Sequence, residues 1–222
     1  MNTFTKQIYL ENPEKTYQSR NFGDFRVIDY LDSLHVKIKF IETEFVTITR
    51  AWCIKNGEIK DKLKPNVYGK GFVGAGIYKT KINGKEVRAY KIWQSMHQRC
   101  YDHKLHDKYP TYIGCFVCEE WHDFQIFSEW FELNYKDGLH LDKDIKVKGN
   151  KVYSPSTCLF VSHAENVVAA SAKHYTFLSP LGELTKTYNL SEFCRKHNLQ
   201  ASKMAAVNLG KRKSHKKWRS PL

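Results

Sequence analysis

Residues 138–145, GLHLDKDI, decide how the middle of this chain is interpreted. In a β-strand, successive side chains point to opposite faces. The two leucines of the stretch then share one face, and the other face carries His140, Asp142 and Asp144. Three ionisable side chains beside a leucine face indicate one of two things: ligands for a metal ion, or a solvated strand edge.

A second strand and a helix are predicted directly after this stretch. Residues 146–150 predict a turn, and KVYSPSTCLFV (151–161) predicts a strand interrupted by Pro155. The following SHAENVVAASA predicts a helix, because Ser162 and Glu165 have the spacing of a capping box. The predicted order is therefore strand, turn, strand and helix.

A hairpin capped by a helix can direct side chains from its first strand and from its helix at one point. Asp142 on the strand and Asn166 on the helix are the candidates. A carboxylate and an amide oxygen are hard ligands that suit Mg²⁺ or Mn²⁺, whose other positions go to water and phosphate. The pattern thus favours one divalent ion that acts on a phosphate ester.

Two apolar helices are predicted before this stretch, with a polar loop at 102–114 between them. The helix over 89–101 has a stripe of Ile92, Trp93, Met96, Cys100 and Tyr101. The helix over 119–135 has a stripe of Trp121, Phe124, Phe127, Trp130 and Phe131. We interpret both stripes as packing surfaces that support the hairpin.

The N-terminal part is predicted to be rich in β-strands, at 25–30, 35–41 and 45–54. The glycine-rich GKGFVGAG (69–76) lacks the Lys-Ser/Thr of a Walker loop, so we do not interpret it as a nucleotide site. Asn83-Gly84, between two alternating segments, predicts a two-residue hairpin.

The charge of the chain indicates a polyanionic partner. The net charge is +13 over 222 residues, and the stretch from Arg195 to Leu222 has nine Lys or Arg and no Asp or Glu. A nucleic-acid surface is the favoured interpretation of this stretch, and a disordered basic tail is the alternative. No apolar run approaches the roughly 20 residues of a membrane span, and the first residues do not resemble a signal peptide. The expected location is therefore cytoplasmic, without a membrane partner.

Six cysteines in a chain without an export signal are expected to be reduced. Cys115 and Cys118 have the spacing of half a zinc site, which Cys100 and Cys158 could complete. Structural Zn²⁺ is the less favoured interpretation, because Phe116 and Val117 occupy the place where a zinc knuckle has turn-forming residues. Buried apolar thiols are favoured.

The central stretch resembles the HNH, or ββα-metal, endonucleases, especially the phage homing type. LDKDI, SPSTCLFV and HAEN stand at the three motif positions of that family. The resemblance implies that Asp142 and Asn166 bind the metal ion. It places Lys143 where the family has its general-base His, and Thr157 where the family has an orienting Asn. His140 and His163 are the other candidates for the base.

The C-terminal stretch resembles the modular helix-turn-helix segment of phage homing endonucleases. A short hairpin at 180–183 leads to a helix, NLSEFCRKHNL, capped by Asn189 or Ser191, and then to a second helix, KMAAVNLG. The first helix is expected to bury Leu190, Phe193, Cys194 and His197. The candidate contacts to bases or backbone are Gln200, Ser202 and Lys203, and those to phosphates are Lys211, Arg212, Lys213, Lys216 and Lys217.

The sequence thus predicts an α+β protein with three modules. These are an N-terminal β-rich module (1–84), an HNH-like nuclease domain (85–172) and a basic DNA-binding module (173–222). The expected function is metal-dependent cleavage of double-stranded DNA, and a monomer is favoured. The alternative is a DNA-binding protein that has the HNH fold without its activity.

Overall fold

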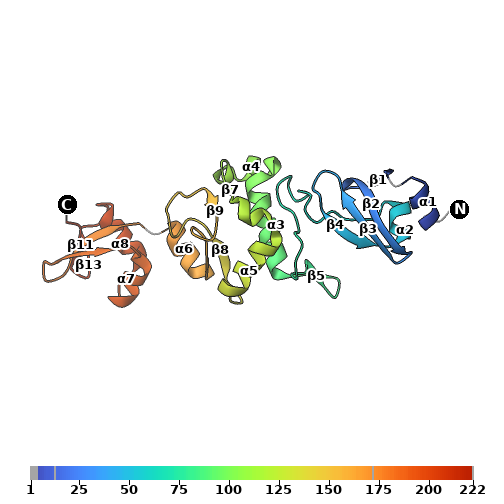
Figure 1. Ribbon diagram of the computed structural model, residues 1–222. Coiled ribbons are helices and arrows are strands. Elements are labelled where there is room, and N and C mark those ends of the chain that lie inside the picture. The colour runs from blue at the N-terminus through green and yellow to red at the C-terminus, as the bar shows by residue number, and fades with distance from the viewer. Residues whose placement is uncertain (1–4, 13, 172, 222) are drawn as a thin grey trace. The chain divides into compact units, whose positions relative to one another are not determined.

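The chain is an α+β protein, as predicted. The computed structural model describes residues 5–12, 14–171 and 173–221 (Figure 1). The chain divides into two compact units. The first unit comprises residues 1–135 and 149–158, and the second comprises residues 136–148 and 159–222.

The N-terminal part of the first unit is a four-stranded antiparallel sheet in the order β1-β2-β3-β4. Its strands are β1 (Thr16–Ser19), β2 (Gly23–Asp32), β3 (His35–Phe40) and β4 (Val46–Thr49). Alternate residues of β2 and β3 are buried, among them Phe25, Val36 and Ile38. This alternation lets one face of the sheet form the core of the N-terminal part.

Two short helices accompany this sheet, and neither is predicted from the sequence. α1 (Lys6–Glu11) begins at Thr5, whose side chain accepts a hydrogen bond from the backbone N–H of Ile8. α2 (Ala51–Asn56) replaces the second half of the strand predicted at 45–54, so that prediction is wrong after Thr49. The helix buries Ala51 and Ile54 and ends at Gly57, which has the positive φ that favours glycine.

The predicted hairpin and the two apolar helices are confirmed. Asn83 and Gly84, both with positive φ, join β5 (Lys81–Ile82) to β6 (Lys85–Glu86). α3 (Arg88–Tyr101) and α5 (Phe124–Asn134) pack on each other, and the indole Nε1 of Trp93 donates to the carbonyl of Trp121 at 2.7 Å. The aromatic stripes are packing surfaces in this core.

Three further elements lie between α3 and α5. The loop predicted at 102–114 contains α4 (His103–Lys108), because the Asp102 carboxylate accepts from the Lys104 N–H and caps a helix there. Two short 3-10 turns, η1 (Pro110–Tyr112) and η2 (Glu119–His122), follow, so Trp121 lies before α5 rather than in it. Between the turns, β7 (Phe116–Val117) pairs in parallel with β9 (Val152–Tyr153).

The glycine-rich segment 69–76 is a packing element. A side-chain carbon on Gly71 would lie 2.7 Å from the Trp93 ring, so this glycine allows close contact with α3. The amide of Gln125, in the first turn of α5, donates to the carbonyls of Val73 and Tyr78 and accepts from the Tyr78 N–H. The segment therefore binds the start of α5 through its backbone.

His97 is a fully buried histidine in the α3–α5 core. Its Nδ1 lies 2.9 Å from the carbonyl of Trp93, so Nδ1 carries the proton and donates it. Its Nε2 has no hydrogen-bond partner in the described part of the chain. Burial, with a smaller effect of nearby His122, lowers the pKa of His97 to about 4. The side chain is therefore a neutral member of the core at pH 7.

The His97 imidazole is expected to make the protein less stable in acid. Between its unfolded pKa near 6.5 and its folded pKa of about 4, the unfolded chain binds a proton that the folded chain rejects. The free energy of unfolding is expected to fall by about 2–3 kcal/mol from pH 7.5 to pH 4.5 through this group. Urea unfolding at both pH values measures the loss, and His97→Gln should remove most of it. An equal loss in parent and variant contradicts the assignment.

The strand predicted at 151–161 is two separate strands with different partners. β9 belongs to the first unit, whereas β10 (Leu159–Val161) pairs antiparallel with β8 (His140–Asp142) in the second. Ser154 ends β9, because its hydroxyl and carbonyl form a local network with the next residues up to Cys158. Pro155 within this turn has no N–H for strand pairing.

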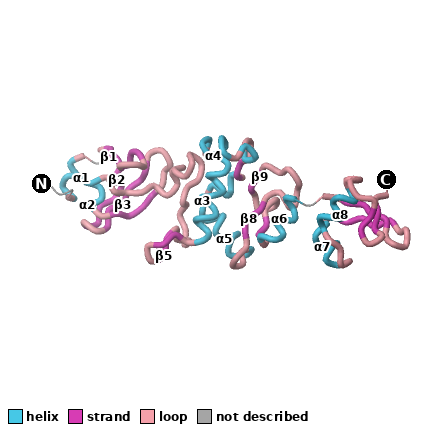
Figure 2. The backbone as a smooth tube through the Cα atoms, turned by 180° about the vertical axis from the view of Figure 1, so that it is seen from behind, coloured by secondary structure: helices cyan, strands magenta, loops and turns pink. Residues whose placement is uncertain are grey.

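The C-terminal part of the second unit combines two hairpins with two helices (Figure 2). The elements are β11 (Tyr175–Leu178), β12 (Leu184–Thr187), α7 (Leu190–Lys196), α8 (Ala201–Asn208), β13 (Ser214–His215) and β14 (Trp218–Arg219). The strands form one sheet in the order β12-β11-β14-β13. Phe177, Phe193, Met204 and Trp218 are members of its core. The sequence predicts the first hairpin and both helices, but not the second hairpin.

Candidate metal and nucleic-acid site

Strand β8 is shorter than predicted and ends at Asp142. Oδ1 of Asp142 accepts hydrogen bonds from the backbone N–H groups of Asp144 and Ile145, both at 2.7 Å. These bonds bend the chain immediately after Asp142. The predicted alternation holds within the strand, where Leu141 is buried and His140 is exposed. Asp144 lies beyond the strand and does not extend the face of His140 and Asp142.

Helix α6 (His163–Ser171) begins with the predicted capping box. The N–H of Glu165 donates to the Ser162 hydroxyl at 3.2 Å, while the Glu165 carboxylate accepts from the Ser162 N–H at 2.8 Å. The bonds that this carboxylate accepts from Ser162 lower the pKa of Glu165, since they stabilise its charged form. The cap fixes the first residue of the helix and thus the direction of its first turn.

The first residue of helix α6 lies beside strand β8, because a histidine of each element is in contact with the other. The rings of His140 on β8 and His163 on α6 have centroids 6.1 Å apart. Asp142 follows His140 by two residues and shares its strand face. Asn166 follows His163 by three residues and shares its helix face. The residue two before Asp142 and the residue three before Asn166 are therefore in contact, so the predicted ligands belong to a strand and a helix that touch at the histidine pair.

The donors on these faces fit a hard cation. Oδ1 of Asp142 is held by two backbone N–H groups, and its Oδ2 has no partner in the described part of the chain. The half-buried side-chain amide of Asn166 likewise has no hydrogen-bond partner among the described residues. Nowhere in that part do three His, Cys, Asp or Glu side chains gather as metal ligands. The donor set suits an ion that keeps most of its water, as Mg²⁺ does.

Lys143, which the sequence resemblance places at the general-base position, is buried and ion-paired. Its Nζ donates to both carboxylate oxygens of Asp144, at 2.7 and 2.8 Å. An ammonium group that donates to a carboxylate has no lone pair with which to take a proton from water. His140 and His163, both exposed, have no hydrogen bonds from their rings among the described residues. The histidines are therefore better placed than Lys143 to accept a proton.

Thr157, the predicted orienting residue, bonds within its own loop. Its hydroxyl donates to the carbonyl of Val152 at 2.8 Å and lies 2.8 Å from the hydroxyl of Ser154. This part of the chain belongs to the first unit. Thr157 therefore stabilises the turn after β9, and the predicted role at the metal site has no support from these contacts.

The four cysteines considered for zinc are free thiols, and three of them, Cys100, Cys115 and Cys158, are buried. The thiol of Cys115 donates to the carbonyl of Thr111 at 3.8 Å. Burial raises the pKa of the Cys118 thiol, which disfavours the thiolate that binds zinc. Their environment is that of small apolar side chains in a core.

The predicted nucleic-acid contacts fall on two elements of the C-terminal module. Gln200 precedes α8, and Ser202 and Lys203 lie in its first turn, because the helix begins at Ala201, two residues earlier than predicted. Lys211, Arg212 and Lys213 lead into the hairpin of β13 and β14, and Lys216 and Lys217 form its turn. These residues are thus part of an ordered hairpin, and the alternative of a disordered tail is wrong.

The structure also tests two predictions for the first helix of this module: which residue caps it, and whether His197 is buried. Asn189, not Ser191, caps α7, because its side chain accepts from the N–H of Glu192. His197 is exposed rather than buried. It follows α7, and its ring packs against Phe193 and Trp218, with centroids 4.6 and 5.0 Å away.

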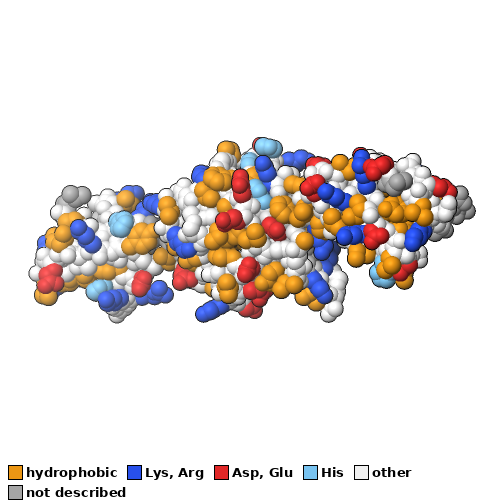
Figure 3. All heavy atoms as spheres, in the orientation of Figure 1, with side chains coloured by type: hydrophobic (Ala, Val, Ile, Leu, Met, Phe, Trp, Pro, Cys, Tyr) orange, Lys and Arg blue, Asp and Glu red, His pale blue; other side chains and the backbone are white. Residues whose placement is uncertain are grey.

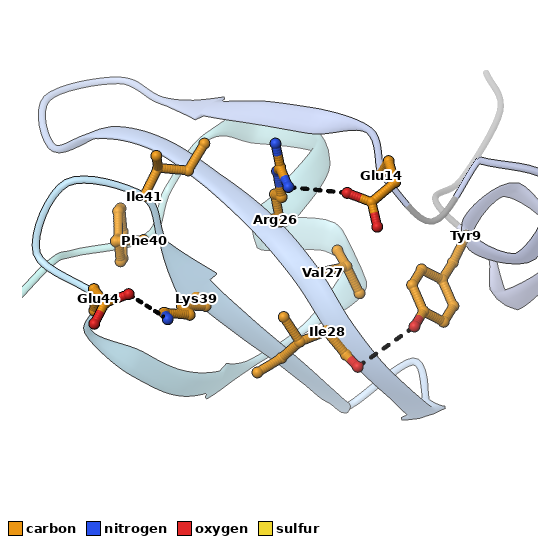
Figure 4. Close-up of a pocket in the computed structure, with 9 residues that line it drawn as sticks. All are labelled: Tyr9, Glu14, Arg26, Val27, Ile28, Lys39, Phe40, Ile41 and Glu44. Carbon is orange, nitrogen blue, oxygen red and sulfur yellow. Dashed lines mark hydrogen bonds and ion pairs between the residues drawn. The ribbon is translucent and has the colours of Figure 1, made fainter.

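A hollow on the outer face of the N-terminal sheet is the other candidate for binding. It has a volume of about 480 Å³ and is lined by Tyr9, Arg26 and Lys39 among others (Figure 4). Glu14 pairs with Arg26 at 2.9 Å, and Glu44 pairs with Lys39 at 2.6 Å. Its cations are thus already neutralised by acids of the same module, so we assign no anionic ligand to it.

Comparisons with known proteins find nothing similar. No family model matches the chain, and neither does any curated protein or solved structure. In the described part of the chain, no helix is long and apolar enough to cross a membrane. The function is therefore inferred from the residues and their geometry.

Proposed function

We propose that this protein is a DNA endonuclease that hydrolyses a phosphodiester bond with one divalent ion, Mg²⁺ or Mn²⁺. The observation that carries the proposal is the contact between His140 and His163. Asp142 lies two residues from His140 on the strand and Asn166 lies three residues from His163 on the helix, so we infer that both ligands lie beside this pair of exposed imidazoles. An acid, an amide and a base beside one another are the groups that metal-assisted hydrolysis of a phosphate ester requires.

Each residue has a separate task in this proposal. Asp142 and Asn166 would hold the ion, which when bound would supply positive charge to stabilise the charge that develops on the phosphate. One imidazole of the histidine pair takes the proton from the attacking water. Asp142 needs little reorganisation to act, because two backbone N–H groups already orient its carboxylate. The Lys and Arg side chains of the C-terminal module, some of which are visible as separate blue groups in Figure 3, bind the DNA backbone.

Cleavage of plasmid DNA by the purified protein tests the activity. Nicked or linear product should appear with Mg²⁺ or Mn²⁺ and disappear with a chelator. Failure to cut any DNA, including DNA from the source of the protein and its relatives, contradicts the proposal.

Replacing the base should slow cleavage strongly. His140→Gln and His163→Gln are expected to differ: the variant that lacks the base should lose roughly 100- to 10,000-fold in rate, and the other much less. Initial rates of plasmid nicking at one saturating Mg²⁺ concentration separate the two, because only loss of the base slows removal of the proton from the attacking water. If both variants cleave like the parent protein, neither histidine is the base.

A DNA-binding protein without nuclease activity is the second candidate. It is favoured by one observation, the ion pair of Lys143 with Asp144 at the position where the resembled family has its base. This candidate predicts DNA affinity that falls with salt, does not depend on divalent ions and survives Asp142→Ala. The plasmid assay and a binding titration together distinguish the two candidates.

A further inference from the structure

The hairpin of β13 and β14 has an unusual turn. Its two turn residues, Lys216 and Lys217, both have positive φ, 46° and 66°. The same chain has another two-residue hairpin turn, Asn83-Gly84, with nearly the same φ values of 49° and 75°. Asn-Gly is the pair that such turns favour, because residues with longer side chains rarely adopt the left-handed conformation. The hairpin of β13 and β14 instead has two lysines in this unfavourable backbone conformation.

The residues on both sides of this turn are held by packing and hydrogen bonds. Next to it, His215 pairs with Trp218, which is buried against Phe193 with ring centroids 5.0 Å apart. The Nε2 of His215, also buried, accepts the backbone N–H of Gln200 at 3.2 Å. On the far side, Arg219 of β14 pairs with Leu178 of β11. The surrounding structure therefore holds the turn in place, which is the condition under which backbone strain persists.

The hairpin concentrates positive charge. Residues 211–219 contain six Lys or Arg and no Asp or Glu, and all six are exposed. Burial is the main cause that lowers the pKa of His215, and the charges of Lys203, Arg212 and Lys216 lower it further. These three cations therefore lie close to one buried side chain of the hairpin, where they can attract the same anion.

The turn also lies beside the connection between the two helices. The Nζ of Lys216 donates to the carbonyl of Asn198, between α7 and α8, at 2.8 Å. An ammonium group has three donors, so this bond leaves two for a ligand. No hydrogen bond or ion pair involves the side chain of Lys217 in the described part of the chain.

We propose that the Lys216-Lys217 turn binds two phosphates of duplex DNA and is a main backbone contact of the C-terminal module. This inference rests on the proposed function, because it specifies how the same DNA is held. The two lysines remain in a turn that disfavours them because the turn directs both ammonium groups to the backbone of the DNA. Helix α8 then needs to supply fewer of the phosphate contacts.

The test exchanges one turn of this protein for the other. Lys216→Asn with Lys217→Gly installs the Asn-Gly pair, so the variant should melt at the same temperature as the parent or higher. Its affinity for duplex DNA at 0.15 M salt should fall roughly ten- to thirtyfold. The slope of log K against log salt should become less steep by about 1.8, since each lost phosphate contact removes about 0.9. The full-length protein and a fluorescent DNA duplex are used.

A matched control removes the same charge elsewhere. Lys6→Gln with Lys55→Gln, on α1 and α2, should leave both affinity and slope near those of the parent. If the turn variant instead melts lower, Lys217→Gln alone replaces it, with an expected slope change of about 0.9. An unchanged slope in the turn variants, with DNA binding intact in the parent, overturns this inference alone. A parent that does not bind duplex DNA, or that binds only RNA, overturns the proposed function as well.

Discussion

The Asp142→Asn variant is expected to cleave DNA roughly 100- to 1,000-fold more slowly than the parent protein, with an unchanged fold. Asparagine keeps an oxygen that can accept the N–H groups of Asp144 and Ile145, so the bend after β8 should survive. It loses the negative charge that attracts a divalent ion. The substitution therefore separates the two tasks of this side chain, which Asp142→Ala would remove together.

Three measurements check this prediction. Initial rates of plasmid nicking over a range of Mg²⁺ concentrations give the loss in activity, thermal melting reports the fold, and a binding titration reports DNA affinity. Asp107→Asn, which removes an exposed carboxylate on α4, should cleave at the parent rate. If Asp142→Asn cleaves as fast as that control, the carboxylate does not hold the ion and the cutting mechanism fails.

The Gly74→Ala variant should be less stable than the parent by about 3–6 kcal/mol. Gly74 has a φ of +73°, which costs an alanine about 1–2 kcal/mol. The added carbon would also meet the carboxylate of Asp123, with its Cγ only 2.7 Å away. That carboxylate caps α5 by accepting the Gln125 N–H at 2.7 Å. Displacing the cap costs about 1 kcal/mol, and relieving the overlap adds about 1–3 kcal/mol.

Gly69→Ala is the matched control, since it lies in the same segment with nearly the same φ of +71°. Apart from its chain neighbours, no atom of the described residues lies within 4 Å of its added carbon, so only the backbone cost of about 1–2 kcal/mol remains. Urea unfolding of both variants gives the difference that belongs to packing against α5. Equal losses at the two glycines mean that the segment does not depend on this contact.

The elements that short-range chemistry controls could be predicted from the sequence. The Asn83-Gly84 hairpin, the capping box of Ser162 and Glu165, and the apolar stripe of α3 each depend on residues within a few turns of the chain. Such signals are complete in the sequence, because the partners are separated by only a few positions. They account for the α+β class and for the order of strand and helix around Asp142.

Strand partners could not be predicted in the same way. The stretch 151–161 has strand composition throughout, and yet β9 pairs with β7 while β10 pairs with β8. The hairpin of β13 and β14 has two lysines at its turn, which is the opposite of a turn signal. β9 and β10 pair with segments far along the chain, and the lysine turn is supported by contacts of β14 with distant Leu178 and Phe193, so local propensity determines neither.

The same distinction applies to the candidate site: some of its features could be predicted from the sequence and others could not. The sequence by itself determined which side chains share a face, because period two links His140 to Asp142 and the helical period links His163 to Asn166. Only the tertiary structure decided that His140 and His163 lie side by side, that Lys143 is buried, and that the basic terminus is an ordered hairpin. The reason is physical: periodicity follows from backbone geometry within one element, whereas contacts and charge pairing follow from how separate elements pack together.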